Sequence, residues 1–235
     1  MGRKLPSGSE RNVFEARRKR ARRIARVLAR LYPKAGIALV YGSEWELLVS
    51  VILSAQCTDK KVNEVTGRLY KRYRNLEEYA KADLREFERD IYQTGFFRAK
   101  TKHIVGSAKI ILRQYGGKVP HTMNELLTLP GVARKTANVV LGNAFGIVEG
   151  IAVDTHVRRL SLKLGLTASR NPKKIERELM MLFPKKEWFD LTYRFIEYGR
   201  KVCPAPRHDC REHALSKIYP KAVDTWPRAD GHIRV

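Results

Sequence analysis

Apolar residues recur at steps of three and four positions along most of the chain, and this spacing predicts helices. The clearest examples lie at residues 47–55, 104–112 and 175–182. One stretch, 147–153, looks extended, but it is short and leads through Gly150, so we build no sheet from it. The pattern therefore predicts an all-α fold of about ten short helices joined by turns rich in Gly and Pro.

The segment 11–31 combines helical spacing with a high density of arginine. Apolar residues such as Ile24 and Leu28 recur on one side, which makes the segment an amphipathic helix. Its basic side is either a solvated face, a phosphate contact or a targeting signal, and the pattern leaves these interpretations open. The last residues, 221–235, show no periodicity and predict a loosely held tail.

Charge narrows the class of partner. The 235 residues contain 47 Lys and Arg against 24 Asp and Glu, a formal net charge of +23, which indicates a polyanionic partner such as nucleic acid. No apolar run approaches the roughly 20 residues that span a bilayer, and no signal-peptide core is visible, so we expect a soluble protein. Three cysteines at irregular spacing form no disulfide framework and indicate a reducing compartment.

The most informative segment is 125–141. An apolar helix is predicted to end at Leu129, Pro130 and Gly131 to form a tight turn, and a second helix to begin near Ala133. Basic residues in a first helical turn oppose the helix dipole, so the basic pair at 134–135 indicates an anion there, and backbone N–H groups after such a turn suit a phosphate. A plain pair of helices with chance basic residues is the alternative.

Two residues in this part of the chain carry candidate chemistry. Lys135 lies beside a helix N-terminus and next to Arg134, and both features disfavour its ammonium form, so its amine could act as a nucleophile near neutral pH. Asp154 follows an apolar stretch and precedes a predicted helix. Aspartate is a preferred N-cap, so capping alone would explain it, although a cap can also present its carboxylate to a ligand.

Four ordered motifs resemble one known family. LSAQCTD at 53–59, GFFRAK at 95–100, LPGV with RKTANVV at 129–140 and VDTH at 153–156 match the endonuclease III family of DNA glycosylases, in the helix-hairpin-helix superfamily, over most of the chain. The resemblance implies two helical lobes with a DNA-binding cleft between them. One is a six-helix lobe at 37–148; the other combines 1–36 with 149–220.

The resemblance also implies roles for individual residues. Lys135 is the nucleophile and Asp154 the carboxylate that assists it. Gln56 fills the space left by an extruded base, and Phe96 is an apolar wedge, roles that a base-flipping enzyme needs, although core packing would also explain either residue. The remaining implied DNA contacts are Gly131, Val132, Ala133, Arg134, Thr136 and His156.

The sequence departs from the family at two places. Members usually hold a [4Fe–4S] cluster with four cysteines, and here the series is Cys203, Cys210, His213 and Tyr219, so we expect no cluster. A zinc site that adds His208 is the alternative, but the sequence favours a metal-free loop with aromatic packing in place of the metal. Ala133 replaces a second hairpin glycine, at a cost of about 1 kcal/mol if that position needs a positive φ.

These observations predict a bifunctional DNA glycosylase with AP-lyase activity, which excises oxidised pyrimidines from duplex DNA in base excision repair by β-elimination and needs no metal. One alternative is a monofunctional mismatch thymine or uracil glycosylase; another is a non-catalytic helix-hairpin-helix DNA-binding protein. Duplex DNA with damaged bases or abasic sites is the expected partner. We expect a monomer without membrane contact, cytoplasmic and nucleoid-associated if the source is prokaryotic.

Overall fold

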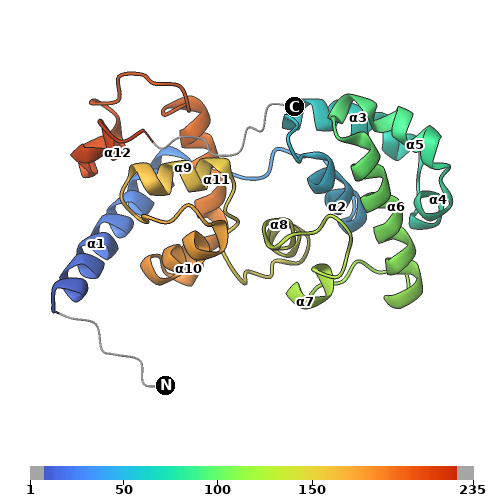
Figure 1. Ribbon diagram of the computed structural model, residues 1–235, viewed down its shortest axis with the longest axis horizontal. Helices are drawn as coiled ribbons and strands as arrows, with labels where there is room; N and C mark the ends of the chain where they lie inside the picture. The colour runs from blue at the N-terminus through green and yellow to red at the C-terminus, as the bar shows by residue number, and fades with distance from the viewer. Residues whose placement is uncertain (1–7, 227–235) are drawn as a thin grey trace. The chain divides into compact units, whose positions relative to one another are not determined.

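A computed structural model describes residues 8–226, and this part of the chain is helical without any β-strand (Figure 1). The fold is therefore all-α, as predicted. The α-helices are α1 (Gly8–Leu31), α2 (Glu44–Leu53), α3 (Asp59–Arg72), α4 (Leu76–Lys81), α5 (Leu84–Ile91), α6 (Phe97–Gln114), α7 (Met123–Leu126), α8 (Arg134–Phe145), α9 (Thr155–Lys163), α10 (Pro172–Leu182), α11 (Trp188–Lys201) and α12 (Ala214–Ile218), and three single 3-10 turns are η1 (Tyr92–Thr94), η2 (Lys185–Glu187) and η3 (Pro220–Ala222).

Most helices begin at a side chain that accepts a hydrogen bond from the first turn. These caps, which fix where each helix starts, are Ser43, Thr58, Asn75, Asp83, Thr122, Asp154 and Asn171. Two helices of the predicted DNA-binding region lack one: α6 begins after Phe96 and α8 after Ala133, neither of which makes a side-chain cap bond. Their first-turn N–H groups therefore have no capping side chain.

The chain divides into two compact units, residues 37–149 and residues 1–36 with 150–235. We call the first the hairpin unit and the second the terminal unit. In the hairpin unit, α4 and α5 pack on α6, and α2 packs on α8. It contains seven α-helices where the sequence predicts six, counting the one-turn helix α7.

The predicted end of the first hairpin helix at Leu129 is wrong. Helix α7 ends at Leu126, and the next residues form tight turns in which the Thr128 amide donates to Glu125 O and the Leu129 amide to Leu126 O. The Thr128 hydroxyl also donates to Glu125 O at 2.7 Å, and a residue that precedes proline disfavours the helical region. Both effects end the helix before the apolar pattern does.

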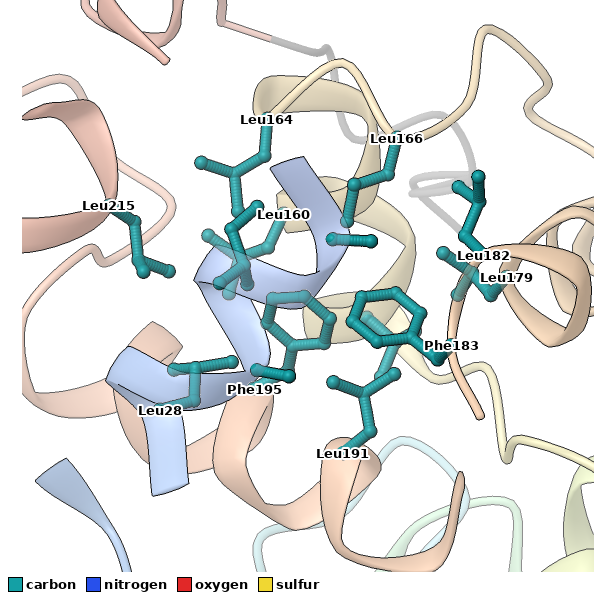
Figure 2. Packing of buried hydrophobic residues seen from close by; sticks show 14 of the residues in the cluster. Leu28, Leu160, Leu164, Leu166, Leu179, Leu182, Phe183, Leu191, Phe195 and Leu215 are labelled. Carbon is teal, nitrogen blue, oxygen red and sulfur yellow. The ribbon is translucent and has the colours of Figure 1, made fainter. Parts of the chain in front are cut away.

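The core of the terminal unit unites the two ends of the chain. Leu28 of α1, Leu160 of α9, Leu179 of α10, Phe195 of α11 and Leu215 of α12 turn toward one apolar centre (Figure 2). Helix α1 is amphipathic, as predicted: its residues Ala21, Ile24 and Leu28 are fully buried, whereas Arg22, Arg23 and Arg26 are exposed. Burial of its apolar stripe thus ties α1 to helices more than a hundred residues away in sequence.

The prediction of a loosely held tail is wrong for residues 221–226. Ala222 is fully buried, and Lys163 Nζ lies 3.5 Å from the centre of the Trp226 ring and donates to Thr225 O at 3.0 Å. Cation–π contact and burial hold this segment although it has no periodicity. Residues 227–235 of the predicted tail lie outside the described residues. Within the described range, no helix combines the length and the apolar character needed to cross a membrane.

Candidate functional site

The hairpin turn is positioned by helix α6. The Ser107 hydroxyl donates to Pro130 O at 3.2 Å, and a Cβ atom on Gly106 would already lie 3.4 Å from Pro130 Cγ. Gly131 has a φ of +76°, and a Cβ atom there would come within 2.6 Å of His103 Nδ1. The turn therefore requires glycine at 131 for both its conformation and its space.

Ala133 does not carry the strain that the sequence predicted for it. Its φ of −93° and ψ of 169° are extended, so the expected cost of a left-handed alanine does not arise. Its neighbour Val132 is buried, and its amide donates to Leu129 O at 3.1 Å. Gly131 alone makes the reversal, which is why a second glycine is not needed.

Lys135 lies in the first turn of α8, between Arg134 and Thr136, and all three residues are half-buried. The next turn, from Ala137 to Leu141, is buried and packs on α2. A basic first turn is thus mounted on a helix that is anchored in the core. This arrangement holds an amine at a helix N-terminus, where an anionic ligand is electrostatically favoured.

Asp154 caps α9 in the terminal unit. Its Oδ1 accepts from the Val157 amide at 2.7 Å, and the carboxylate is half-buried after a buried stretch from Ile151 to Val153. The capping interpretation is therefore confirmed. A carboxylate has a second oxygen, so the cap fixes the direction of the group without using all its acceptors.

His156 follows in the first turn of α9, where it packs on α11. A Cβ atom on Gly199 would clash with the His156 ring at Nδ1 and would lie 3.2 Å from Arg159 Nη2. Gly199 therefore makes room for the imidazole against the helix.

Gln56 and Phe96 share an unusual backbone conformation. Gln56 has a φ of 53° and Phe96 a φ of 49°, and among the residues the structure describes no other non-glycine residue has a positive φ. Both are exposed, and Phe96 has 62% of its surface exposed although it is apolar. Such conformations cost on the order of 1–3 kcal/mol and concentrate at functional sites.

A buried lysine connects the loops that carry these two residues. Lys100 of α6 is only 3% exposed, and its Nζ donates to Leu53 O and to Thr94 O, each at 2.8 Å. Leu53 lies three residues before Gln56, and Thr94 two before Phe96. Burial lowers the pKa of Lys100. Sequence reasoning assigned Lys100 no role; its signal was a lysine four positions before buried Ile104, on the buried face of the helix.

The loop between α11 and α12, residues 202–213, contains the remaining candidate residues, and we call it the cysteine loop. Cys203 and Cys210 are both buried, and burial raises the pKa of the Cys203 thiol. Arg159 anchors the loop: its Nη2 donates to Cys203 O at 2.6 Å, and its Nη1 lies 3.9 Å from Cys203 Sγ.

The cysteine loop does not fit a [4Fe–4S] cluster. Such a cluster is held by four thiolates, and the third and fourth positions here are His213 and Tyr219. Tyr219 is engaged elsewhere: its ring lies 3.9 Å from the Arg20 guanidinium, which donates to Gly165 O at 2.7 Å. Packing against α1 therefore uses the residue that would have been the fourth ligand.

Known proteins share both the sequence and this architecture. A family model described as HhH-GPD superfamily base excision DNA repair protein matches residues 49–185. An endonuclease III of Synechocystis sp. is 49% identical over 207 residues, covering 88% of this chain and 94% of the relative. The endonuclease III of Bacillus subtilis is 44% identical over 189 residues, covering 80% and 86%. A solved structure of a trapped endonuclease III–DNA covalent intermediate superposes with a TM-score of 0.83 at 39% identity, covering 87% of this chain and 96% of that one. The chain belongs to the endonuclease III family.

Proposed function

We propose that this protein is a bifunctional DNA glycosylase and AP lyase of base excision repair. The observation that carries the proposal is Lys135, an amine in the uncapped first turn of the second hairpin helix, in a chain related to an enzyme with a trapped covalent DNA intermediate. A monofunctional glycosylase that activates water needs a carboxylate only. A DNA-binding protein without catalysis needs neither Lys135 nor the carboxylate of Asp154.

The chemistry begins at the sugar of the damaged nucleotide. The neutral amine of Lys135 attacks C1′, the bond from C1′ to the base breaks, and the base leaves with a proton. Asp154 stabilises positive charge on the sugar or transfers the protons of this step. The C1′–O4′ bond then breaks, its electron pair stays on O4′, and the remaining amine proton moves to that oxygen; this opens the sugar ring and gives an imine between Nζ and C1′.

Strand cleavage follows from the imine. It makes the 2′ hydrogen acidic, a base removes that proton, and the electron pair expels the 3′ phosphate as the C3′–O bond breaks. Water then hydrolyses the imine and releases Lys135. Each step needs a proton donor or acceptor, and none needs an external oxidant or reductant.

DNA handling is the role we assign to the other residues of the hairpin unit. The N–H groups at the start of α8, with Arg134, suit a phosphate. A base must leave the helix before Lys135 can reach its sugar, and the exposed ring of Phe96 suits a wedge between bases. Gln56 offers an amide that can hydrogen-bond in the vacated space. His156 is a further DNA contact in this proposal.

The substrate class that we propose is oxidised pyrimidine in duplex DNA, together with abasic sites. The protein would act as a monomer, and the partner of a chain with a net charge of +23 is the DNA itself. In a bacterial cell this places the protein in the cytoplasm with the nucleoid.

Borohydride trapping on an abasic-site duplex tests the proposal. Wild-type protein should form a covalent adduct and nick the strand, and Lys135→Ala should do neither. Arg134→Ala is the matched control, because it removes a neighbouring cation but keeps the amine: it should bind more weakly and still trap. Equal trapping by Lys135→Ala and wild type would refute the assignment. Release of base from an oxidised-pyrimidine duplex, compared with mismatched thymine and uracil duplexes, tests the substrate class.

A further inference from the structure

Three ligand groups of the cysteine loop converge on one point. Cys203, His208 and His213 each offer one ligand atom, and these atoms all lie within 4.8 Å of one another. A tetrahedral Zn²⁺ with ligands at about 2.0–2.3 Å holds its ligand atoms roughly 3.3–3.8 Å apart. A contraction of about 1 Å in the side chains would therefore close the set around one ion.

Two buried imidazole nitrogens in this cluster lack a partner. His208 Nδ1 lies 2.7 Å from Pro206 O, and because a carbonyl only accepts, Nδ1 carries the proton and Nε2 carries the lone pair. His208 Nε2 and His213 Nδ1 are both buried without a hydrogen-bond partner among the described residues. Buried polar atoms nearly always have a hydrogen-bond partner, so two unpaired nitrogens at one point indicate a ligand-binding position. An N–H donated to a backbone carbonyl is also the usual way that a metal-binding histidine is oriented.

Aromatic contacts hold the two imidazoles in place. The rings of His208 and His213 stack with centroids 5.2 Å apart, and Trp226 meets His208 edge-on at 5.1 Å. Tyr198 of α11 contacts His213 at 6.5 Å between centroids. Both histidines therefore have packed neighbours that restrict their rotamers, which is what a preorganised metal site needs.

The cysteines complete a donor set suited to zinc. Cys203 is 2% exposed and Cys210 1% exposed, and the His213 amide donates to Cys210 O at 3.2 Å, which ties the second cysteine to the same turn. Two thiolates and two imidazoles form a frequent structural zinc set, and two thiolates balance the charge of one divalent ion.

We propose that the cysteine loop binds a single Zn²⁺ through Cys203, His208 and His213, the three residues whose ligand atoms already converge. Cys210 lies on the same turn but outside that cluster, and it becomes the fourth ligand when the loop closes on the ion. This replaces the metal-free interpretation that the sequence favours, and it does not depend on the proposed glycosylase activity. The ion would be structural, because all four donors come from one loop and fix it between α11 and α12. Binding would release the proton of each thiol that coordinates.

Elemental analysis of protein made without a polyhistidine tag and without chelator tests the site. Wild type should contain about one zinc per chain and no stoichiometric iron or sulfide. His208→Ala and His213→Ala should each lose most of the zinc. His121→Ala, an exposed histidine of the hairpin unit, is the matched control and should retain it, as should Cys57→Ser. Zinc retained in both loop-histidine variants would overturn the proposal, and so would stoichiometric iron with sulfide.

Cobalt substitution tests the unaltered protein, so that a variant that fails to fold leaves the proposal falsifiable. Wild type exchanged with Co²⁺ should show the intense visible bands of tetrahedral cobalt and a thiolate charge-transfer band in the near ultraviolet. Cys203→Ser should weaken the charge-transfer band. Wild-type protein with neither zinc nor this cobalt spectrum would overturn the proposal.

Discussion

Replacement of Lys100 by methionine tests whether this lysine braces the loops of Gln56 and Phe96. Methionine keeps the length and apolar stem but removes both hydrogen bonds at 2.8 Å, leaving Leu53 O and Thr94 O without their donor. A hydrogen bond from a charged group contributes about 1.5–3 kcal/mol, so two contribute roughly 3–6 kcal/mol. Burial of the ammonium offsets part of this, since burial lowers the Lys100 pKa. We expect a net loss of about 2–4 kcal/mol.

Thermal unfolding and hydrogen exchange measure this effect together. For a chain of this size, the loss corresponds to a fall in the hairpin unit's melting temperature of roughly 5–15 °C. Amide exchange should accelerate at 54–58 and 92–97, where the two loops lie, and stay unchanged in α9 of the terminal unit. Lys102→Met is the matched control, because Lys102 is exposed on the same helix.

The pH dependence has a definite sign. The folded-state pKa of Lys100 is lowered from 10.5, so between that lowered pKa and 10.5 the unfolded chain binds more protons. The stability advantage of wild type over Lys100→Met should therefore increase as pH rises through this window and decrease as pH falls through the folded pKa. A variant as stable as wild type, with unchanged exchange at both loops, would refute the bracing role.

Three further predictions concern the hairpin, the cap and the basic helix. Asp154→Asn should keep the α9 cap, the melting temperature and duplex binding, yet lose most base release; an unchanged glycosylase rate would leave Asp154 as a cap only. Gly131→Ala should weaken affinity for an abasic duplex, because it forces a left-handed alanine against His103, whereas Ala133→Gly should leave that affinity within about a factor of two; equal effects would contradict the assigned backbone geometry. Affinity for duplex DNA should fall steeply as salt concentration rises. If α1 contacts phosphates, changing Arg22, Arg23 and Arg26 together to Gln should reduce the slope of log K against log salt concentration by up to about 3. An unchanged slope would show that this face of α1 is solvated.

The hairpin shows how far the sequence predicts local structure. Pro130 and Gly131 correctly located the reversal, since their backbone limits act within a few residues. The helix before it ends early, at Leu126, because a threonine hydroxyl and the proline ahead compete with the helix, and an apolar pattern does not register either effect. At Ala133 the family comparison predicted strain that the actual φ excludes. Turn position was thus predictable, but the dihedral angle of each residue was not.

Long-range partners were beyond the sequence. In the sequence, little distinguishes Lys100 from the many other basic residues. Only the fold brings Leu53, 47 positions away, to its ammonium group. The cysteine loop is similar: its spacing shows two thiols and two imidazoles, but the orphaned nitrogens of His208 and His213 depend on how the loop closes. Residues 221–226 were predicted as tail because a single Trp226 contact leaves no periodic signal.

In the hairpin unit, the hydrogen bonds of Lys100 hold the two residues that have a strained backbone, Gln56 and Phe96. A left-handed Gln56 and a left-handed Phe96 each cost on the order of 1–3 kcal/mol, and such strain persists only where the surroundings over-determine it. The two hydrogen bonds of Lys100 are of comparable magnitude, and they hold the chain just before each strained residue. A structural role alone would favour glycine at both positions, since glycine adopts a positive φ without this cost. Side chains kept at that cost, and exposed rather than packed, are better explained by what they contact outside the protein than by the stability of the fold.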